Sequence, residues 1–411
     1  MKHSLLPLLI AAVSLTAATA EERWTNLIQG DSLAGWKQLG GKAAYVLKDG
    51  VIIGTSVPRE PNSFLCTEKS FSNFILEYEF SVEDTLNSGV QIRSNSLPDF
   101  HNGRVHGYQV EIDADQPNRK WTGGLYEEGR RGWLFNLKDR PAAQNAAKRG
   151  GAWNQVRVEA IGPHLKTFVN GVPCADLLDA FTTRGFIGLQ VHGVGNDAAK
   201  VGKTARWRNL RIQDLGEAKW VPAFPDGKTQ GWQPTPGGKW EMINGILTGT
   251  SPQGESRHGI FLSDKSWSDF AIRFKFRVTK GNSGFYFRSE RVQDAVAVAG
   301  FQAELDETPA TGGLYETGGR GWVAQTDPKS MEAVYKPHEW NEMCVICQGN
   351  RTVVQVWRWE DKNTLRWVKS AELTSDQGRR EGHFGFQLHG GMEMQVEFKD
   401  VEILAGKAAQ P

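Results

Sequence analysis

This chain of 411 residues has almost no net charge, few cysteines and few long apolar runs. The formal net charge of +1 provides no electrostatic footprint for binding nucleic acid. Beyond the N-terminal segment, no stretch is apolar enough to span a membrane. Helical periodicity is also lacking, apart from residues 139–148, where a short helix is expected. These absences leave a β-rich chain whose length predicts two or three domains.

The four cysteines do not form a metal or redox motif. Cys344 and Cys347 make a C-x-x-C, but no second such pair occurs, and the surrounding residues read as a strand. A spacing of three places these two side chains on opposite faces of a strand. Cys66 and Cys174 could form a disulfide in an exported protein, and the sequence leaves that pairing open.

Residues 1–20 have the features of a secretory signal peptide. A weakly basic start precedes an apolar run over 5–18, and small residues occupy 18–20. We therefore expect a secreted or periplasmic protein with no membrane span after signal cleavage. We expect residues 407–411 to be a C-terminal tail.

What the chain has in abundance is glycine, tryptophan and internal repetition. It holds 46 Gly and 15 Trp, which suit many turns and either large cores or sugar-stacking surfaces. Five motifs recur in the same order, at 87–94 and 282–289, 122–127 and 311–316, 131–133 and 320–322, 153–154 and 340–341, and 188–193 and 385–390. The repetition predicts two homologous domains, 21–216 and 217–406. Alternating apolar segments separated by Gly, Asn and Asp turns predict that both are all-β sandwiches.

Several strands pair an apolar face with a strongly polar one. Gln109, Glu111 and Asp113 share one face of a strand, and the second unit repeats this pattern at 302, 304 and 306. Gln190 likewise lies beside His192 on one face, and we place Arg93 on the face of its own strand that carries Gln91. Because both copies keep the same residue types, we interpret this face as a ligand-handling surface. A solvated outer sheet face is the alternative.

The repeated motifs resemble those of the 3-keto-disaccharide hydrolase family. They are Gly-Trp at 35 and 231, N-S-G-x-x-x-R-S, G-[YF]-Q-x-E-x-D, T-G-G-L-Y and G-x-[IF]-G-[LF]-Q-x-H-G. The resemblance implies a concanavalin A-like (jelly-roll) fold in each unit and action on glycosides oxidised at C3. It also shows a departure, because family members carry an acid where this chain has Gln109 and an amide where it has Glu111.

On this resemblance we hypothesise roles for the polar face. His192 would be the base, Arg93 the oxyanion stabiliser, and Glu111 or Tyr126 the acid that protonates the leaving group. The corresponding catalytic residues of the second unit are His389, Arg288, Glu304 and Tyr315. The expected substrate-binding residues are Gln109, Asp113, Arg131, Gln190, Gln302, Asp306, Arg320 and Gln387.

Two other functions stay open at this point. A non-catalytic tandem carbohydrate-binding protein would use the same hydroxyl-binding groups. A retaining β-glucanase would use Glu111 and Asp115, although Thr308 breaks that pattern in the second unit. Asp113 could contribute to a calcium site. Because His101, His106 and Asp115 are extra to the first unit, we favour that unit as the working one. The oligomeric state is not predicted.

Overall fold

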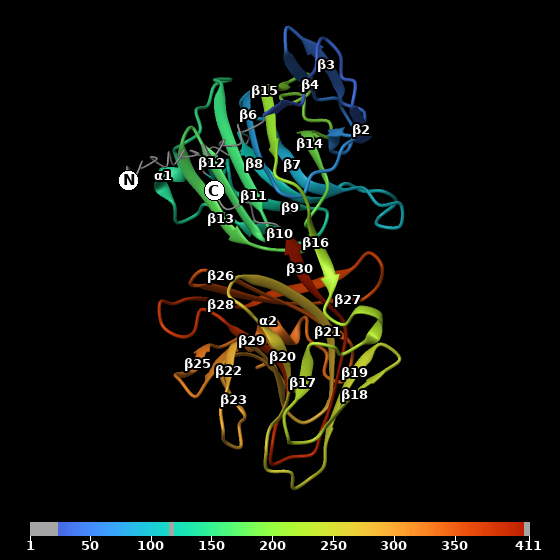
Figure 1. The fold of residues 1–411 in the computed structure, drawn as a ribbon. Coiled ribbons are helices and arrows are strands. Elements are labelled where there is room, and N and C mark those ends of the chain that lie inside the picture. The colour runs from blue at the N-terminus through green and yellow to red at the C-terminus, as the bar shows by residue number, and fades with distance from the viewer. Residues whose placement is uncertain (1–23, 115–118, 407–411) are drawn as a thin grey trace, which may run out of the picture.

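The computed structural model describes residues 24–114 and 119–406. The predicted signal peptide, Asp115 and the C-terminal tail lie outside the described residues. Within them, strands form four antiparallel sheets arranged as two β-sandwiches, stacked one on the other (Figure 1). The predicted fold class, two tandem all-β domains, is confirmed.

The first domain pairs an outer sheet with a site sheet. The outer sheet runs β13 (Val172–Leu178), β12 (His164–Val169), β11 (Asn154–Ile161), β6 (Phe74–Val82), β15 (Thr204–Asp214), β4 (Val51–Thr55) and β3 (Ala44–Lys48), with β1 (Thr25–Asn26) beside β15. The site sheet runs β10 (Gly132–Phe135), β9 (Leu125–Glu128), β8 (His106–Asp113), β7 (Asn87–Asn95), β14 (Phe186–Val191), β5 (Ser63–Thr67) and β2 (Trp36–Gly40).

The second domain repeats this arrangement. Its outer sheet runs β18 (Lys239–Ile243), β19 (Ile246–Ser251), β30 (Met394–Gly406), β21 (Phe270–Lys280), β26 (Asn341–Gln348), β27 (Arg351–Trp359) and β28 (Leu365–Thr374), with β16 (Ala218–Pro222) beside β30. Its site sheet runs β17 (Trp232–Pro234), β20 (Gly259–Trp267), β29 (Gly382–Leu388), β22 (Ser283–Arg291), β23 (Val298–Leu305), β24 (Leu314–Thr317) and β25 (Gly321–Ala324).

Helices are short. The helix expected at 139–148 is the single turn α1 (Pro141–Gln144), which begins at a proline suited to the first helical position. A second turn, α2 (Pro328–Glu332), begins in the same way after Asp327 accepts a hydrogen bond from Ser330 N–H. A 3₁₀ turn spans Pro225–Gly227. No helix among residues 24–114 and 119–406 is long and apolar enough to cross a membrane.

Strand β8 shows how the core positions the polar face. Val110 and Ile112 point into the sandwich core, whereas Gln109, Glu111 and Asp113 lie on the opposite side. All five side chains are buried, with Glu111 only 4% exposed. An ordinary solvated face would leave such carboxylates in water. The alternation predicted from sequence is therefore real, and its polar side is covered by neighbouring groups.

An apolar cluster joins the two domains. Leu178 and Ala180 of the first domain pack with Ile346, Val353 and Trp357 of the second. Figure 1 shows β13 directly above β26 and β28 at this junction. Because strand β26 is buried along nearly its whole length, one of its faces serves its own core and the other serves the junction. The domains thus share a packed interface.

All four cysteines are free thiols. Cys344 lies in the cluster between the domains and Cys347 in the core of the second domain, so they point to opposite faces as predicted. Cys66 and Cys174 belong to separate apolar clusters of the first domain and are not bridged.

Candidate functional site

A cavity of about 410 Å³ opens on the polar side of the first domain's site sheet. Strands β7, β8, β9, β10 and β14 and the loops around them supply its walls. Its lining residues are Asn62, Asn87, Arg104, Gln109, Glu111, Arg119, Tyr126, Glu128, Trp133, Gln190 and His192. It thus brings together five residues selected from the sequence, Gln109, Glu111, Tyr126, Gln190 and His192. We refer to it as the first-domain cleft.

Glu111 lies at the floor of this cleft. Its carboxylate accepts hydrogen bonds from Asn87 Nδ2 (2.8 Å) and Gln109 Nε2 (2.9 Å) and lies 3.3 Å from the Arg119 guanidinium. Burial raises the pKa of Glu111 to about 7, although Asn87, Gln109 and Arg119 act in the opposite direction. A carboxyl group with this pKa can exchange a proton with a ligand near neutral pH.

Arg119 connects Glu111 to Asp113. Its Nε and one terminal nitrogen each donate to Asp113 at 2.8 Å, in the bidentate geometry that favours Arg–carboxylate pairs. Asp113 also accepts from the Trp121 N–H at 2.9 Å. Asp113 does not line the cleft, and it pairs with Arg119 instead. Both of its carboxylate oxygens already accept hydrogen bonds from nitrogen donors, which is unlike a calcium ligand.

His192 follows β14 at the mouth of the cleft and is exposed. Its Nδ1 lies 2.8 Å from the carbonyl oxygen of Gly193. A carbonyl can only accept, so this contact assigns the proton of the neutral ring to Nδ1 and leaves the Nε2 lone pair available. His192 therefore has the tautomer that a general base requires.

Gln190 is fully buried, yet neither its Oε1 nor its Nε2 has a hydrogen-bond partner among the described residues. A buried amide without partners costs free energy, and most such groups in native proteins are satisfied. Because Gln190 lines the cleft, its amide has the placement expected of a group that pairs with a ligand hydroxyl.

Aromatic rings form one side of the cleft. Tyr126 packs edge-on against Trp133, with 5.4 Å between ring centroids, and Trp133 packs in turn against Trp121 at 4.7 Å. Burial, followed by the charges of Glu128 and Glu111, raises the pKa of Tyr126. Its hydroxyl therefore stays protonated at neutral pH and suits a hydrogen-bond donor.

The second domain repeats the buried carboxylate. Glu304 accepts from Asn282 Nδ2 and, at 2.8 Å, from Gln302 Nε2. Burial raises the pKa of Glu304 to about 7, as it does for Glu111. Tyr315 packs edge-on against Trp322 with centroids 5.5 Å apart.

Gln387 and His389 lie beside a second histidine. Gln387 Nε2 is 2.9 Å from His258 Nδ1, and the His258 and His389 rings are 4.3 Å apart between centroids. Burial, together with the nearby His389, lowers the pKa of His258 to about 4. Both rings thus share one corner of the second domain's polar face.

The predicted shared face of Arg93 and Gln91 is wrong. Arg93 has φ of 46° at an irregularity of β7, which interrupts the alternation and turns its side chain across the sandwich. It is fully buried, and it donates to the carbonyl oxygens of Ser72 (2.7 Å) and Gly162 (2.8 Å). Burial lowers its pKa to about 10. Arg93 anchors turns and does not line the cleft.

Arg288 repeats this anchoring in the second domain. It has the same φ of 46° and donates to the carbonyl oxygens of Ser268 (2.9 Å) and Gly349 (2.9 Å). Neither arginine is therefore placed to stabilise an oxyanion on the polar face.

The predicted rim position of Arg131 is also wrong. Its guanidinium is buried at the junction of the domains, where it pairs with Glu127 (2.5 Å) and Asp179 (2.8 Å). The ring of Trp367, from the second domain, lies 5.0 Å from it. Asp179 also accepts from Gln355 Nε2 of the second domain at 2.7 Å. The sequence could not reveal this role, because the partners lie far apart in the chain.

Arg320, the counterpart of Arg131, is exposed. It pairs with Glu316 and donates to Ser375 Oγ at 3.0 Å within its own domain. Asp306, the counterpart of Asp113, is half-buried and accepts from the Thr308 N–H at 2.5 Å. Neither contact involves a group corresponding to Arg119.

Sequence reasoning did not select six lining residues of the cleft: Asn62, Asn87, Arg104, Arg119, Glu128 and Trp133. Asn87 begins a repeated motif, so its recurrence as Asn282 was a usable signal. The second domain has no arginine at the positions of Arg104 and Arg119, so no repeated pattern marked these two residues in the sequence.

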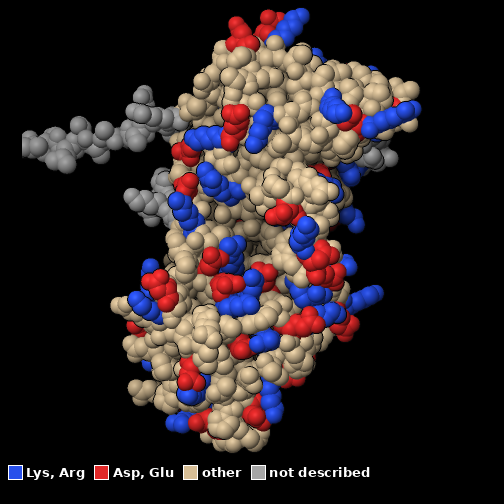
Figure 2. All heavy atoms as spheres, turned by 90° about the vertical axis from the view of Figure 1, so that its right-hand side faces the viewer, with Lys and Arg blue, Asp and Glu red and all other residues tan. Residues whose placement is uncertain are grey.

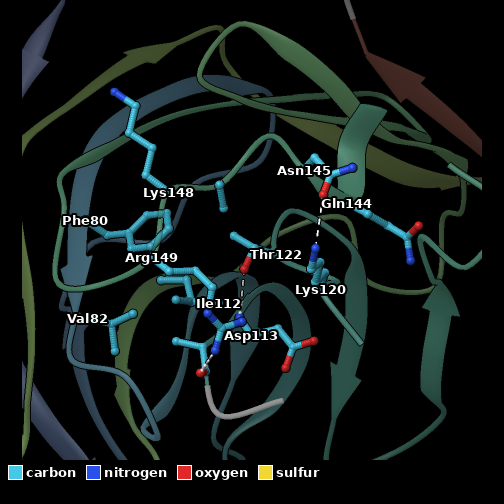
Figure 3. Close-up of a pocket in the computed structure, with 12 residues that line it drawn as sticks. Phe80, Val82, Ile112, Asp113, Lys120, Thr122, Gln144, Asn145, Lys148 and Arg149 are labelled. Carbon is cyan, nitrogen blue, oxygen red and sulfur yellow. Dashed lines mark hydrogen bonds between the residues drawn. The ribbon is translucent and has the colours of Figure 1, made fainter. Parts of the chain in front are cut away.

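A smaller cavity of about 100 Å³ lies beyond Asp113, beside α1 (Figure 3). There Lys120 donates to Asn145 at 3.1 Å, and Thr122 Oγ1 accepts from the Asp113 N–H at 2.9 Å. Among residues 24–114 and 119–406, no group of three His, Cys, Asp or Glu side chains could hold a metal ion.

Comparison with known proteins decides the family. A family model described as a 3-keto-alpha-glucoside-1,2-lyase-like domain matches residues 23–213 and again 219–404. The chain belongs to this family. Membership in the 3-keto-alpha-glucoside-1,2-lyase-like family supports a carbohydrate-active function, and its two matches correspond to the two sandwiches. No match was found among curated proteins.

Three solved structures match part of this chain at low sequence identity. A "putative glycosyl hydrolase" from Parabacteroides distasonis is 17% identical, with a TM-score of 0.35, covering 47% of this chain and 94% of its own. The carbohydrate binding module CBM66 from Bacillus subtilis is 18% identical, with a TM-score of 0.32, covering 43% and 96%. The Ca²⁺/Man2-bound VIP36 exoplasmic/lumenal domain is 13% identical, with a TM-score of 0.33, covering 44% and 83%.

Proposed function

We propose that the first-domain cleft cleaves glycosides that carry a ketone at C3 of the sugar. The observation that carries this proposal is the convergence of Glu111, His192 and Tyr126 in one cleft of a chain that belongs to the 3-keto-alpha-glucoside-1,2-lyase-like family. A C3 ketone makes the proton on C2 more acidic, so a side-chain base can remove it. The reaction then needs no strongly activated nucleophile.

The reaction would proceed in two steps. His192 Nε2 takes the C2 proton, the electron pair forms the C1–C2 double bond, and the C1–O bond breaks. The departing oxygen receives a proton from Glu111, whose pKa of about 7 keeps a large fraction protonated near neutrality. Water then adds across the double bond, with OH to C1 and H to C2, which completes a net hydrolysis.

Charge on the enolate oxygen needs a cationic partner. Arg93 does not line the cleft, so we assign this role to Arg119 or Arg104, which do. Gln190 and Gln109 would bind sugar hydroxyls, and Tyr126 and Trp133 would contact the ring. Export from the cytoplasm, inferred from residues 1–20, belongs to the same proposal.

Release of a chromogenic leaving group from a 3-keto-glucoside tests the proposal. We expect release by the wild type, a large loss in His192→Ala, and little change in the matched variant His389→Ala. If Glu111 supplies the proton, kcat/KM falls as the pH rises above about 7, because its acid form is lost. Tight binding of plain glycosides without release from any substrate would instead identify a carbohydrate-binding protein.

A further inference from the structure

A second cavity continues the first-domain cleft. Its volume is about 680 Å³, and it shares Asn62, Arg104 and Glu128 with the cleft. The Arg104–Glu128 ion pair, at 2.9 Å, stands where the two spaces meet. A ligand bound at Glu111 therefore has room to extend past this pair, and we call the second space the extension cavity.

The wall of the extension cavity comes from the loop between β7 and β8. His101, Asn102, Gly103, Arg104 and Val105 all line it. The first three have φ of 44°, 55° and 84°, so the chain turns sharply at this wall. The loop is closed within itself, because the Gly103 carbonyl oxygen accepts from Ser96 Oγ at 2.5 Å and the Gly103 N–H donates to Phe100 O at 3.0 Å.

The second domain holds the tip of this loop. Asn363 Oδ1 accepts from the His101 N–H at 2.8 Å, and the Asn363 carbonyl oxygen lies 3.1 Å from His101 Nε2. Next to this contact, Phe100 packs edge-on against Trp359, with ring centroids 6.3 Å apart. Asn363 is in turn fixed by Asp361, which accepts from its N–H at 2.7 Å. Asn363 and Trp359 of the second domain thus contact the loop that walls a cavity in the first, and Asn363 makes the hydrogen bonds.

The lining is mixed in chemistry. Phe64, Pro61 and Val105 provide apolar surface, whereas Asn62 and Glu128 provide hydrogen-bonding groups. Such a surface suits a hydroxylated ring, which has both apolar C–H faces and polar edges.

We propose that the extension cavity binds the leaving-group portion of a glycoside, and that Asn363 of the second domain is a positioning residue that sets specificity for large leaving groups. This inference rests on the proposed function of the cleft. It assigns the second domain a part in substrate selection that does not require a site of its own.

The test compares two 3-keto-glycosides with alcohol leaving groups of different size, a 3-keto-disaccharide and a 3-keto methyl glucoside. In the full chain, Asn363→Ala should lower kcat/KM for the disaccharide about fivefold, mainly through KM, because one hydrogen bond that fixes the wall is lost. The methyl glucoside should change less than about twofold, since it does not reach the loop. Asn363→Asp keeps the acceptor and should restore the disaccharide activity.

Asn350→Ala is the matched control. Asn350 lies in the turn between β26 and β27 of the same domain and donates to Asp376 at 2.9 Å, and its side chain forms no hydrogen bond with the described residues of the first domain. It should leave both substrates unchanged. Equal losses on both substrates in Asn363→Ala, or no loss on either, would overturn the inference.

Calorimetric titration with the two unoxidised glycosides separates the inference from the proposed function. If the wild type turns over neither keto substrate, the proposed function fails, and the same selective weakening of disaccharide binding in Asn363→Ala still decides whether Asn363 shapes the extension cavity. Equal binding of the disaccharide by wild type and variant would then overturn it.

Discussion

The two domains bury the same carboxylate but surround it differently. Glu111 and Glu304 each accept hydrogen bonds from an Asn and a Gln, and burial brings both pKa values to about 7. Around Glu111 stand Arg104, Arg119 and Glu128. Strand register places Thr317 where the first domain has Glu128, and counting back along the chain from Gly107 and Gly300 aligns Ala297 with Arg104.

The arginine beside Glu111 also has no counterpart. Arg119 lies in the segment 114–121 of the sequence, whereas the corresponding segment 307–310 of the second domain is shorter and reads Glu-Thr-Pro-Ala. The second domain instead places His258 at the position of Asn62. The buried carboxylate therefore lies on an equivalent strand in both domains. Whether charged side chains lie beside it depends on the segments that flank those strands. On this basis the first domain is the better equipped for proton transfer.

Substituting the two carboxylates should give the largest difference. Glu111→Gln removes the group that donates the proton, and we expect kcat on a 3-keto-glucoside to fall about 10²- to 10⁴-fold. Glu304→Gln should leave kcat within about twofold, because the second domain lacks the accompanying arginines. Steady-state kinetics of both variants measures this, and comparable losses in the two would show that both domains turn over substrate.

The homologous arginines Arg131 and Arg320 should differ in their effect on stability. Arg131→Met leaves Asp179 buried without a cation and Glu127 with Arg130 alone, which should cost about 3–5 kcal/mol of unfolding free energy. Arg320→Met removes a partly exposed pair and should cost less than about 1 kcal/mol. Urea unfolding of both variants gives the two values. If both variants lose a similarly small amount of unfolding free energy, water reaches the charged groups at the junction of the domains.

Arg119 should tune the cleft without being required for folding. Its charge acts to lower the pKa of Glu111, so Arg119→Met should move that pKa upward from about 7. The limb of the kcat/KM profile that reports Glu111 would then shift to higher pH, with a loss of about tenfold in the maximum. If this limb of the pH profile does not move, the charge of Arg119 does not influence the pKa of Glu111.

Acid should loosen the junction by a modest amount. Burial alone would raise the pKa of Asp179, but Arg131, Tyr108 and Gln355 hold it below its ordinary value. A depressed pKa stabilises the fold above the unfolded value of about 4, and this stabilisation is lost as the pH falls through the folded value. The fall in unfolding free energy below about pH 4 should therefore be shallower in Asp179→Asn, whose overall stability is already lower.

Reductant should have the smallest effect. All four cysteines are free and buried, so neither domain depends on a disulfide. Adding a thiol reductant should leave Tm unchanged, whereas loss of a disulfide would remove about 2–4 kcal/mol. A drop in Tm would show that a disulfide forms in the protein, contrary to the four free thiols of the structure.

Much of the site could be predicted where strand alternation holds. Glu111, Gln109 and Gln190 lie on the polar side because a strand turns every second side chain to the same face. The prediction failed for Arg93 because a backbone irregularity with positive φ breaks the alternation, and a single sequence does not mark such a point.

The sequence by itself determined the two sandwiches, their duplication and the residue types of the polar face, because periodicity and repetition are local properties of the chain. Only the tertiary structure decided which polar groups meet. Arg131 is a junction residue because Asp179 and Trp367 come together around it. His101 is tied to Asn363 across 262 positions of sequence. Contacts between distant segments depend on how whole domains pack, and packing is not encoded in any one segment's pattern.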